Sequence, residues 1–186
     1  MHSSYLYFAD DRFSAAELSA ARLDGHLVEL GEGYIPADAV ETTHLRAASL
    51  AVLLGDTLAA THLSAAWVYG ALDEVPARHA VQRAVPRRIH QLIDRRFLYR
   101  DGYIETDDVT TVGGVLVTAP ARTTADLARI VQAEPDSAVA LRGMARVFPG
   151  VLAEARAWFH AHGPVPGKRG ALRVLEDEES ELVRMM

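Results

Sequence analysis

Residues 109–129 read VTTVGGVLVTAPARTTADLAR, and this stretch decides the fold that the sequence predicts. Two runs rich in β-branched residues, 109–112 and 115–118, flank the pair Gly113 and Gly114. β-Branched side chains favour strands, and a pair of glycines between strands can adopt the positive φ angles of a tight primed turn. The stretch therefore predicts a β-hairpin.

The end of the same stretch predicts a helix that follows the hairpin directly. Pro120 is expected to end the second strand, because proline cannot donate a hydrogen bond to a strand ladder. Thr123 and Asp126 have the spacing of a capping box, which marks the start of a helix. Leu127 and Ile130 then fall on one helical face. We expect the helix to begin at Thr123.

The periodicity of apolar residues, with glycine and proline as breaks, predicts further elements on both sides of this stretch. The other expected helices cover residues 14–24, 41–54, 62–69, 137–147, 151–162 and 168–184. The other expected strands cover residues 26–30, 33–35, 58–61, 79–85, 97–99 and 103–105, the last two as a hairpin. Residues 87–96 fit a helix and an exposed loop equally well.

These elements predict an α+β fold. A central antiparallel β-sheet is expected between about residue 58 and residue 118, flanked by helices that precede and follow it in the chain. The first helix and the β-ribbon after it have the order of a shortened winged helix. We expect a truncated winged-helix-like module at residues 1–40 and a second domain at residues 41–186.

Composition excludes several classes of protein. The chain has 186 residues, of which 49% are hydrophobic and 24% charged, as expected for a domain with a real core. It has no cysteine, which excludes disulfides and thiolate metal sites. No apolar run has the length of a membrane span, and the N-terminus lacks a signal-peptide pattern. We expect a cytoplasmic protein without membrane contact.

The net charge of −6 hides one basic segment. Residues 78–100 hold seven arginines and a single acid, Asp94. Such a band can contact phosphates without reading base sequence, but it can equally meet an acidic protein or remain solvated. The candidate nucleic-acid or partner-binding residues are Arg83, Arg87, Arg88, Arg95 and Arg96.

Common catalytic and cofactor motifs are missing from the sequence. There is no phosphate-binding P-loop, no Gly-x-Ser-x-Gly elbow, no His-Glu-x-x-His pair and no dinucleotide-binding glycine motif. His160 and His162 are two positions apart, as are His62 and Ser64, so neither pair shares a helical face. We expect no metal, no cofactor and no enzymatic activity.

The best polar cluster consists of Arg122, Thr123, Thr124 and Asp126. At a helix N-terminus these residues could bind a phosphate or a carboxylate, because free N–H groups, the helix dipole and the guanidinium all favour an anion there. Alternatively, Arg122 pairs with Asp126 one turn further on and locks the hairpin to the helix. The sequence favours this second, structural interpretation.

Residues 115–129, VLVTAPARTTADLAR, resemble the signature of the AbiEi-family antitoxins. These proteins are the antitoxin halves of type IV toxin–antitoxin systems, and related actinobacterial transcriptional regulators share the pattern. Further similar stretches follow in the family's order, so that the resemblance covers most of residues 41–175. They are THLSAAWVYG at 61–70, the strand ending in Val-Pro at 79–86, Asp-Asp-Val at 107–109 and PGKRGAL at 166–172.

The resemblance implies an antitoxin domain that opposes a nucleotidyltransferase-like toxin without necessarily forming a stable complex with it. It also implies an N-terminal winged helix that binds the operon's own promoter DNA. Here the N-terminal module is short, and Glu29 and Glu32 stand where the family's wing is usually rich in arginine. Acids that face phosphates are repulsive, which counts against DNA binding through this wing. Many longer relatives carry a nuclease-like domain after the last helix, and we expect none after Met186.

The sequence thus predicts a non-enzymatic antitoxin and transcriptional regulator with an AbiEi-like antitoxin domain at residues 41–186. Two alternatives remain. One is a protein-binding module that does not bind DNA. The other is a small phosphate- or nucleotide-handling enzyme centred on Arg122 and Asp126.

Overall fold

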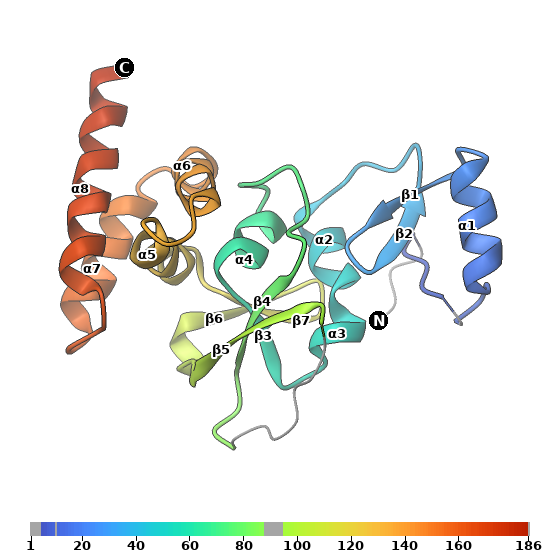
Figure 1. Cartoon of the computed structure of the whole chain (residues 1–186), viewed down its shortest axis with the longest axis horizontal. Coiled ribbons are helices and arrows are strands. Elements are labelled where there is room, and N and C mark those ends of the chain that lie inside the picture. Colours follow the sequence, from blue (N-terminus) through green and yellow to red (C-terminus); the bar gives the residue numbers. More distant parts are fainter. Residues whose placement is uncertain (1–4, 10, 88–94, 186) are drawn as a thin grey trace.

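The computed structural model describes residues 5–9, 11–87 and 95–185 (Figure 1). In these ranges the N-terminal unit, a mixed sheet and a group of four helices follow one another along the long axis of the molecule (Figure 1). None of the described helices is both long and apolar enough to cross a lipid bilayer. The α+β class is confirmed.

The N-terminal unit is one helix followed by a two-stranded ribbon. Helix α1 (Ala15–Leu23) begins at a capping box between Ser14 and Glu17, as the sequence predicts. Strands β1 (Leu27–Leu30) and β2 (Gly33–Pro36) pair antiparallel. The described part of this unit therefore has a single helix before its ribbon.

The central sheet contains five strands in the order β5-β4-β3-β7-β6. They are β3 (Leu58–Ala60), β4 (His79–Arg83), β5 (Phe97–Tyr103), β6 (Val109–Val112) and β7 (Val115–Thr118). The hairpin expected between residues 109 and 118 is present as β6 and β7, paired antiparallel through the glycine turn.

The expectation of a purely antiparallel sheet is wrong for two of its four pairings. β3 pairs with β7 in parallel, and β4 pairs with β5 in parallel. Parallel neighbours need long crossover connections, whereas a short turn can join only antiparallel strands. The two-residue glycine turn joins the antiparallel pair β6 and β7, whereas residues 84–96 separate the parallel neighbours β4 and β5, and the sequence does not reveal that these strands pair.

The hairpin expected around Arg100 and Gly102 is also wrong, because β5 runs through this segment as one strand. The pairing register of β4 and β5 shifts between Val81 and Arg83, which marks a bulge. Gly102 has a φ of 147°, and a side chain there would approach the Gln82 amide at 3.1 Å. Glycine at this position serves the bulge and not a turn.

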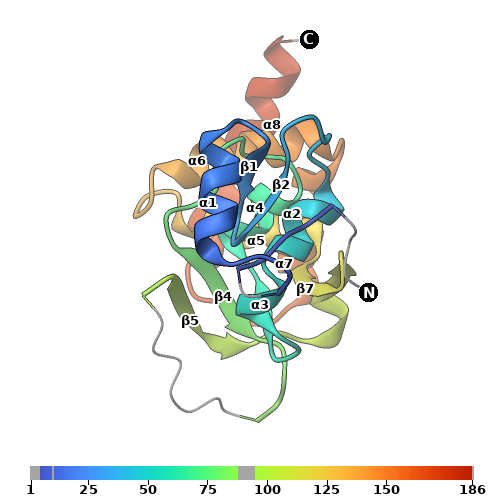
Figure 2. The same cartoon turned by 90° about the vertical axis from the view of Figure 1, so that its right-hand side faces the viewer.

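Three short helices, α2 (Thr43–Ser49), α3 (Ala51–Leu54) and α4 (His62–Val68), pack on the sheet. The single helix expected over residues 41–54 is divided at Leu50. The remaining helices form the group at the other end of the molecule, and the end of the last one projects beyond it (Figures 1 and 2). They are α5 (Pro120–Ile130), α6 (Asp136–Val147), α7 (Val151–Ala161) and α8 (Lys168–Met185).

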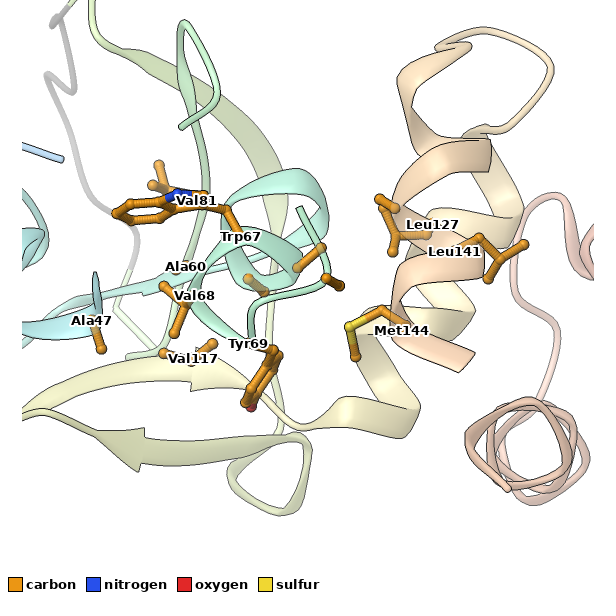
Figure 3. Close-up of a cluster of buried hydrophobic side chains, with 14 of the residues drawn as sticks. Ala47, Ala60, Trp67, Val68, Tyr69, Val81, Val117, Leu127, Leu141 and Met144 are labelled. Atoms are coloured by element: carbon orange, nitrogen blue, oxygen red, sulfur yellow. The ribbon is translucent and has the colours of Figure 1, made fainter. Parts of the chain in front are cut away.

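The α4 helix lies between the sheet and this group of helices, and side chains on its two sides join both (Figure 3). Trp67 and Val68 lie on the side of the sheet, near Val81 and Val117 (Figure 3). Trp67 is 1% exposed, and such a large buried ring contributes several kcal/mol, roughly 3–5 by truncation to alanine. Met144 of α6 belongs to the same buried cluster.

Gly143 of α6 provides a sharp test of this packing, because an added Cβ would lie 2.0 Å from the Ala71 carbonyl oxygen. Helix propensity alone predicts that Gly143→Ala stabilises the protein by about 1 kcal/mol. We expect the opposite, a loss of roughly 1–3 kcal/mol in unfolding free energy, since backbone must move to make room. The matched control is Gly170→Ala in α8, where a Cβ meets nothing within 4 Å. Urea denaturation of both variants decides the point, and equal stabilisation would show that α6 does not pack on residue 71.

Candidate functional site

The Arg122 guanidinium lies between two carboxylates. Its Nε donates to Asp126 Oδ2 at 2.8 Å, one turn further along α5, and its Nη1 donates to Asp108 Oδ2 at 2.5 Å. Asp108 ends the short 3₁₀ helix η1 (Thr106–Asp108) that leads into β6. Arg122 is only 9% exposed and Asp126 is fully buried. The pairing proposed from sequence is therefore present, with a second acid that the sequence did not identify.

The two carboxylates extend this network to two further elements, α7 and the turn before α8. Asp126 Oδ1 accepts from Arg129 Nη1 at 3.0 Å, and Arg129 Nε donates to the Pro166 carbonyl at 2.9 Å. Asp108 Oδ1 accepts from the indole Nε1 of Trp158 at 2.6 Å. Four elements therefore meet at the network: η1, α5, α7 and the turn before α8.

The charges in this network compensate one another. Burial by itself lowers the pKa of Arg122, but the carboxylates of Asp126 and Asp108, with their hydrogen bonds, raise it overall. The guanidinium also lies over the Trp158 ring, 4.9 Å from its centroid, which adds a cation–π contact. A phosphate at this guanidinium would have to displace carboxylates that are themselves buried. The geometry favours the structural interpretation of Arg122 and Asp126.

The neighbouring threonines bond to local carbonyl groups. Thr123 Oγ1 donates to the Thr118 carbonyl at 2.9 Å, and Thr124 Oγ1 donates to the Pro120 carbonyl at 2.8 Å. The capping box expected at Thr123 is wrong, because α5 begins three residues earlier at Pro120. Proline suits the first position of a helix, since its fixed φ is helical and its missing N–H would have no partner there.

The basic band divides into internal and exposed arginines. Arg83 donates to the carbonyl of Pro86 at 2.6 Å and lies over the Tyr103 ring, so it serves the sheet. Arg87 and Arg95 are exposed. Arg96 is exposed as well, and it donates to Glu32 of the ribbon turn at 2.7 Å. Arg88, another candidate from the sequence, lies outside the described residues.

The structure joins Ser64, His79 and Glu32 in a chain that the sequence did not suggest. His79 Nδ1 lies 3.5 Å from Ser64 Oγ, and His79 Nε2 lies 3.4 Å from Glu32 Oε1. The order matches that of a hydrolytic triad. However, Ser64 is fully buried, and its Oγ accepts the Ala80 N–H at 2.9 Å. A hydroxyl without access to substrate positions His79 and does not attack a carbonyl.

His62 is a buried histidine in an unusual backbone conformation. Its φ of 49° makes it the one residue other than glycine with a positive φ in the part of the chain that the structure describes. Its Nδ1 lies 2.8 Å from Thr61 Oγ1. Burial lowers the pKa of His62 to about 4, an effect that Asp126 opposes and Arg100 reinforces. His62 is thus neutral near pH 7.

Among the described residues, no three His, Asp or Glu side chains are grouped so that they could hold a metal ion. A pocket opens at the start of α8, beside the turn at Pro166 that Arg129 contacts. Its lining is Pro164, Val165, Gly167, Lys168, Arg169, Gly170 and Leu172.

Comparison with known proteins finds a family match for part of the chain. Residues 58–148 match the family model described as the AbiEi antitoxin C-terminal domain. The matched region contains the whole sheet, Asp108 and the Arg122–Asp126 pair, whereas Glu32 and Trp158 lie outside it. This match supports an antitoxin or regulator role and implies a toxin as the counterpart.

The chain is also similar to a solved structure, the crystal structure of the RV2827C protein from Mycobacterium tuberculosis. The two are 16% identical, the similarity covers 88% of this chain and 70% of that chain, and the TM-score is 0.37. No curated protein matches the chain.

The substitution Arg122→Met tests the buried network. It leaves two buried carboxylates without their shared cation, so we expect the unfolding free energy to fall by about 3–5 kcal/mol. Arg142→Met is the matched control, because Arg142 forms a single pair with Glu178 and its side chain is 55% exposed. That control should cost less than about 1 kcal/mol. Equal effects in thermal and urea denaturation would mean that the network adds nothing beyond a surface ion pair.

The low pKa of His62 predicts an acid-sensitive fold. Between about pH 6.5 and 4 the unfolded chain binds a proton at His62 that the folded chain does not, so stability falls as the pH falls. The loss attributable to His62 is up to about 3 kcal/mol. His62→Asn removes the titrating group and keeps a side chain that tolerates positive φ, so the pH dependence should flatten. Exposed His26→Asn serves as the control, and an unchanged slope in the His62 variant would refute the assignment.

Proposed function

We propose, from the match of residues 58–148 to the AbiEi antitoxin C-terminal domain, that the protein is the antitoxin and transcriptional regulator of a type IV toxin–antitoxin system. Its counterpart is a nucleotidyltransferase-like toxin, and its own promoter DNA is a second partner. The family match is the observation that carries the proposal. We further infer a division into a truncated winged-helix-like module, residues 1–40, and the antitoxin domain, residues 41–186.

The geometry around Arg122 supports a non-enzymatic protein. Arg122 and Asp126 neutralise each other in the interior, and the second carboxylate, Asp108, is held by the Trp158 indole as well. An acid–base catalyst needs a group that can reach a substrate proton. Here the carboxylate oxygens point at arginine and tryptophan donors, which weakens the alternative of a phosphate-handling enzyme at this position.

For nucleic acid, we propose that the contact face includes Arg87, Arg95 and Arg96. Among the candidates that the structure describes, these three lie on the surface, whereas Arg83 donates to carbonyls of its own loop. Arginines on a surface add affinity for phosphates that depends on salt and not on base sequence. The alternative, a protein-binding module, predicts no DNA affinity at any salt concentration.

The wild-type protein tests the antitoxin role, and two double variants test the proposed DNA-binding face. Arg87→Ala with Arg95→Ala removes two charges from the proposed face, and Arg142→Ala with Arg173→Ala removes two exposed charges from the helical end. Wild-type protein should restore growth to cells that express a nucleotidyltransferase-like toxin from the same operon. It should also bind a promoter duplex in 50 mM salt, and affinity should fall at least tenfold at 200 mM, the order expected for several phosphate contacts.

Only the first variant should lose DNA affinity. Failure of the wild-type protein to restore growth would contradict the antitoxin role. Absence of DNA binding at 50 mM salt would leave the protein-binding alternative, and equal losses in the two variants would place the nucleic-acid face elsewhere.

A further inference from the structure

Glu32, at the turn of the β1–β2 ribbon, points into the protein. Its Oε2 accepts from Arg96 Nη1 at 2.7 Å, and its Oε1 lies 3.4 Å from His79 Nε2. Its side chain is 18% exposed, whereas that of Glu29 on the same ribbon is 62% exposed and pairs with Arg22. The two acids that the sequence places together in the wing therefore have different roles, and only Glu29 faces solvent.

The backbone of the turn is seated against the antitoxin domain. A Cβ on Gly31 would lie 2.2 Å from Ser49 Oγ of α2 and 3.2 Å from the Trp67 ring of α4. Leu30 and Ile35, on the two ribbon strands, belong to the same buried cluster as Trp67. The tip that a winged helix would present to DNA is therefore packed against α2 and α4 in this structure.

Contacts on the far side of its ring orient His79 toward the Glu32 carboxylate. His79 begins β4, and its Nδ1 lies beside the Ser64 hydroxyl, which the Ala80 N–H fixes in turn. Burial lowers the pKa of His79, while Glu32 raises it and Arg96 lowers it. The neutral ring can accept from Ser64 at Nδ1 and donate from Nε2 to the carboxylate of Glu32.

Arg96 also belongs to the face proposed above for nucleic acid. We propose that Glu32 is a built-in competitor for phosphate: its carboxylate occupies Arg96 and His79 while the ribbon is docked, and nucleic acid gains this part of the face when the ribbon undocks. The inference rests on the proposed nucleic-acid binding. The chemistry is a simple exchange, because carboxylate and phosphate oxygens both accept charge-assisted hydrogen bonds from a guanidinium.

The test compares Glu32→Gln with Glu29→Gln, which remove one charge each from the same ribbon. Hydrogen exchange of the backbone reports docking, and fluorescence anisotropy with a promoter duplex in 50 mM salt reports binding. In Glu32→Gln, exchange over residues 27–36 should rise about tenfold, the size expected for loss of one hydrogen bond between charged groups. Exchange in β3 and β7 should stay unchanged, which shows that the antitoxin domain remains folded.

DNA affinity should rise several-fold in Glu32→Gln relative to Glu29→Gln, since both have the same net charge. Equal affinities in the two variants would overturn the competition, and unchanged exchange over residues 27–36 would overturn the docking contact. If no variant binds DNA, the proposed nucleic-acid function fails and the competition fails with it, while exchange still reports on docking. The double exchange Glu32→Arg with Arg96→Glu should restore protection to the ribbon, and a failure to do so would refute the Glu32–Arg96 pair as the contact.

Discussion

The Arg122 guanidinium lies between the carboxylates of Asp108 and Asp126. All three side chains are buried, so water cannot take the place of a lost partner. Taking charges out of water costs several kcal/mol for each ion, so this cluster persists only because every charge has a partner. The partners come from η1, α5, α7 and the turn before α8. The cluster therefore fixes how the helical group meets the sheet, and Tyr69 supports the same junction by donating to the Thr118 carbonyl at 2.8 Å.

This constraint also explains why the most suggestive residues of the sequence are not arranged as a catalyst. Arg122, Thr123, Thr124 and Asp126 point at one another or at local carbonyls. Ser64 and His79 have the order of a nucleophile and its base, yet both are buried beneath the ribbon turn. In both places polar side chains satisfy buried groups. The polar groups that remain exposed include the charged side chains of Arg87, Arg95 and Arg96, which suit binding.

The match of residues 58–148 to the AbiEi antitoxin C-terminal domain covers the sheet but not the ribbon. The expectations about the wing came from a resemblance that this match does not extend to, so the match gives them no support. Glu32 was expected to be an acid of the wing that counts against DNA binding there, and the structure pairs it with Arg96, 64 residues further along the chain. A charge pattern read along a strand does not say which side of that strand is covered.

The sequence by itself determined the hairpin at 109–118, the helices with clear apolar periodicity and the pairing of Arg122 with Asp126. Each depends on local rules, namely the φ angles of glycine, β-branched side chains and the i,i+4 spacing of a helix. Only the tertiary structure decided the parallel pairings, the single strand at 97–103 and the partners Asp108 and Trp158. The physical reason is that these contacts join segments distant in sequence, so they form where the whole core packs best, and no short pattern encodes that.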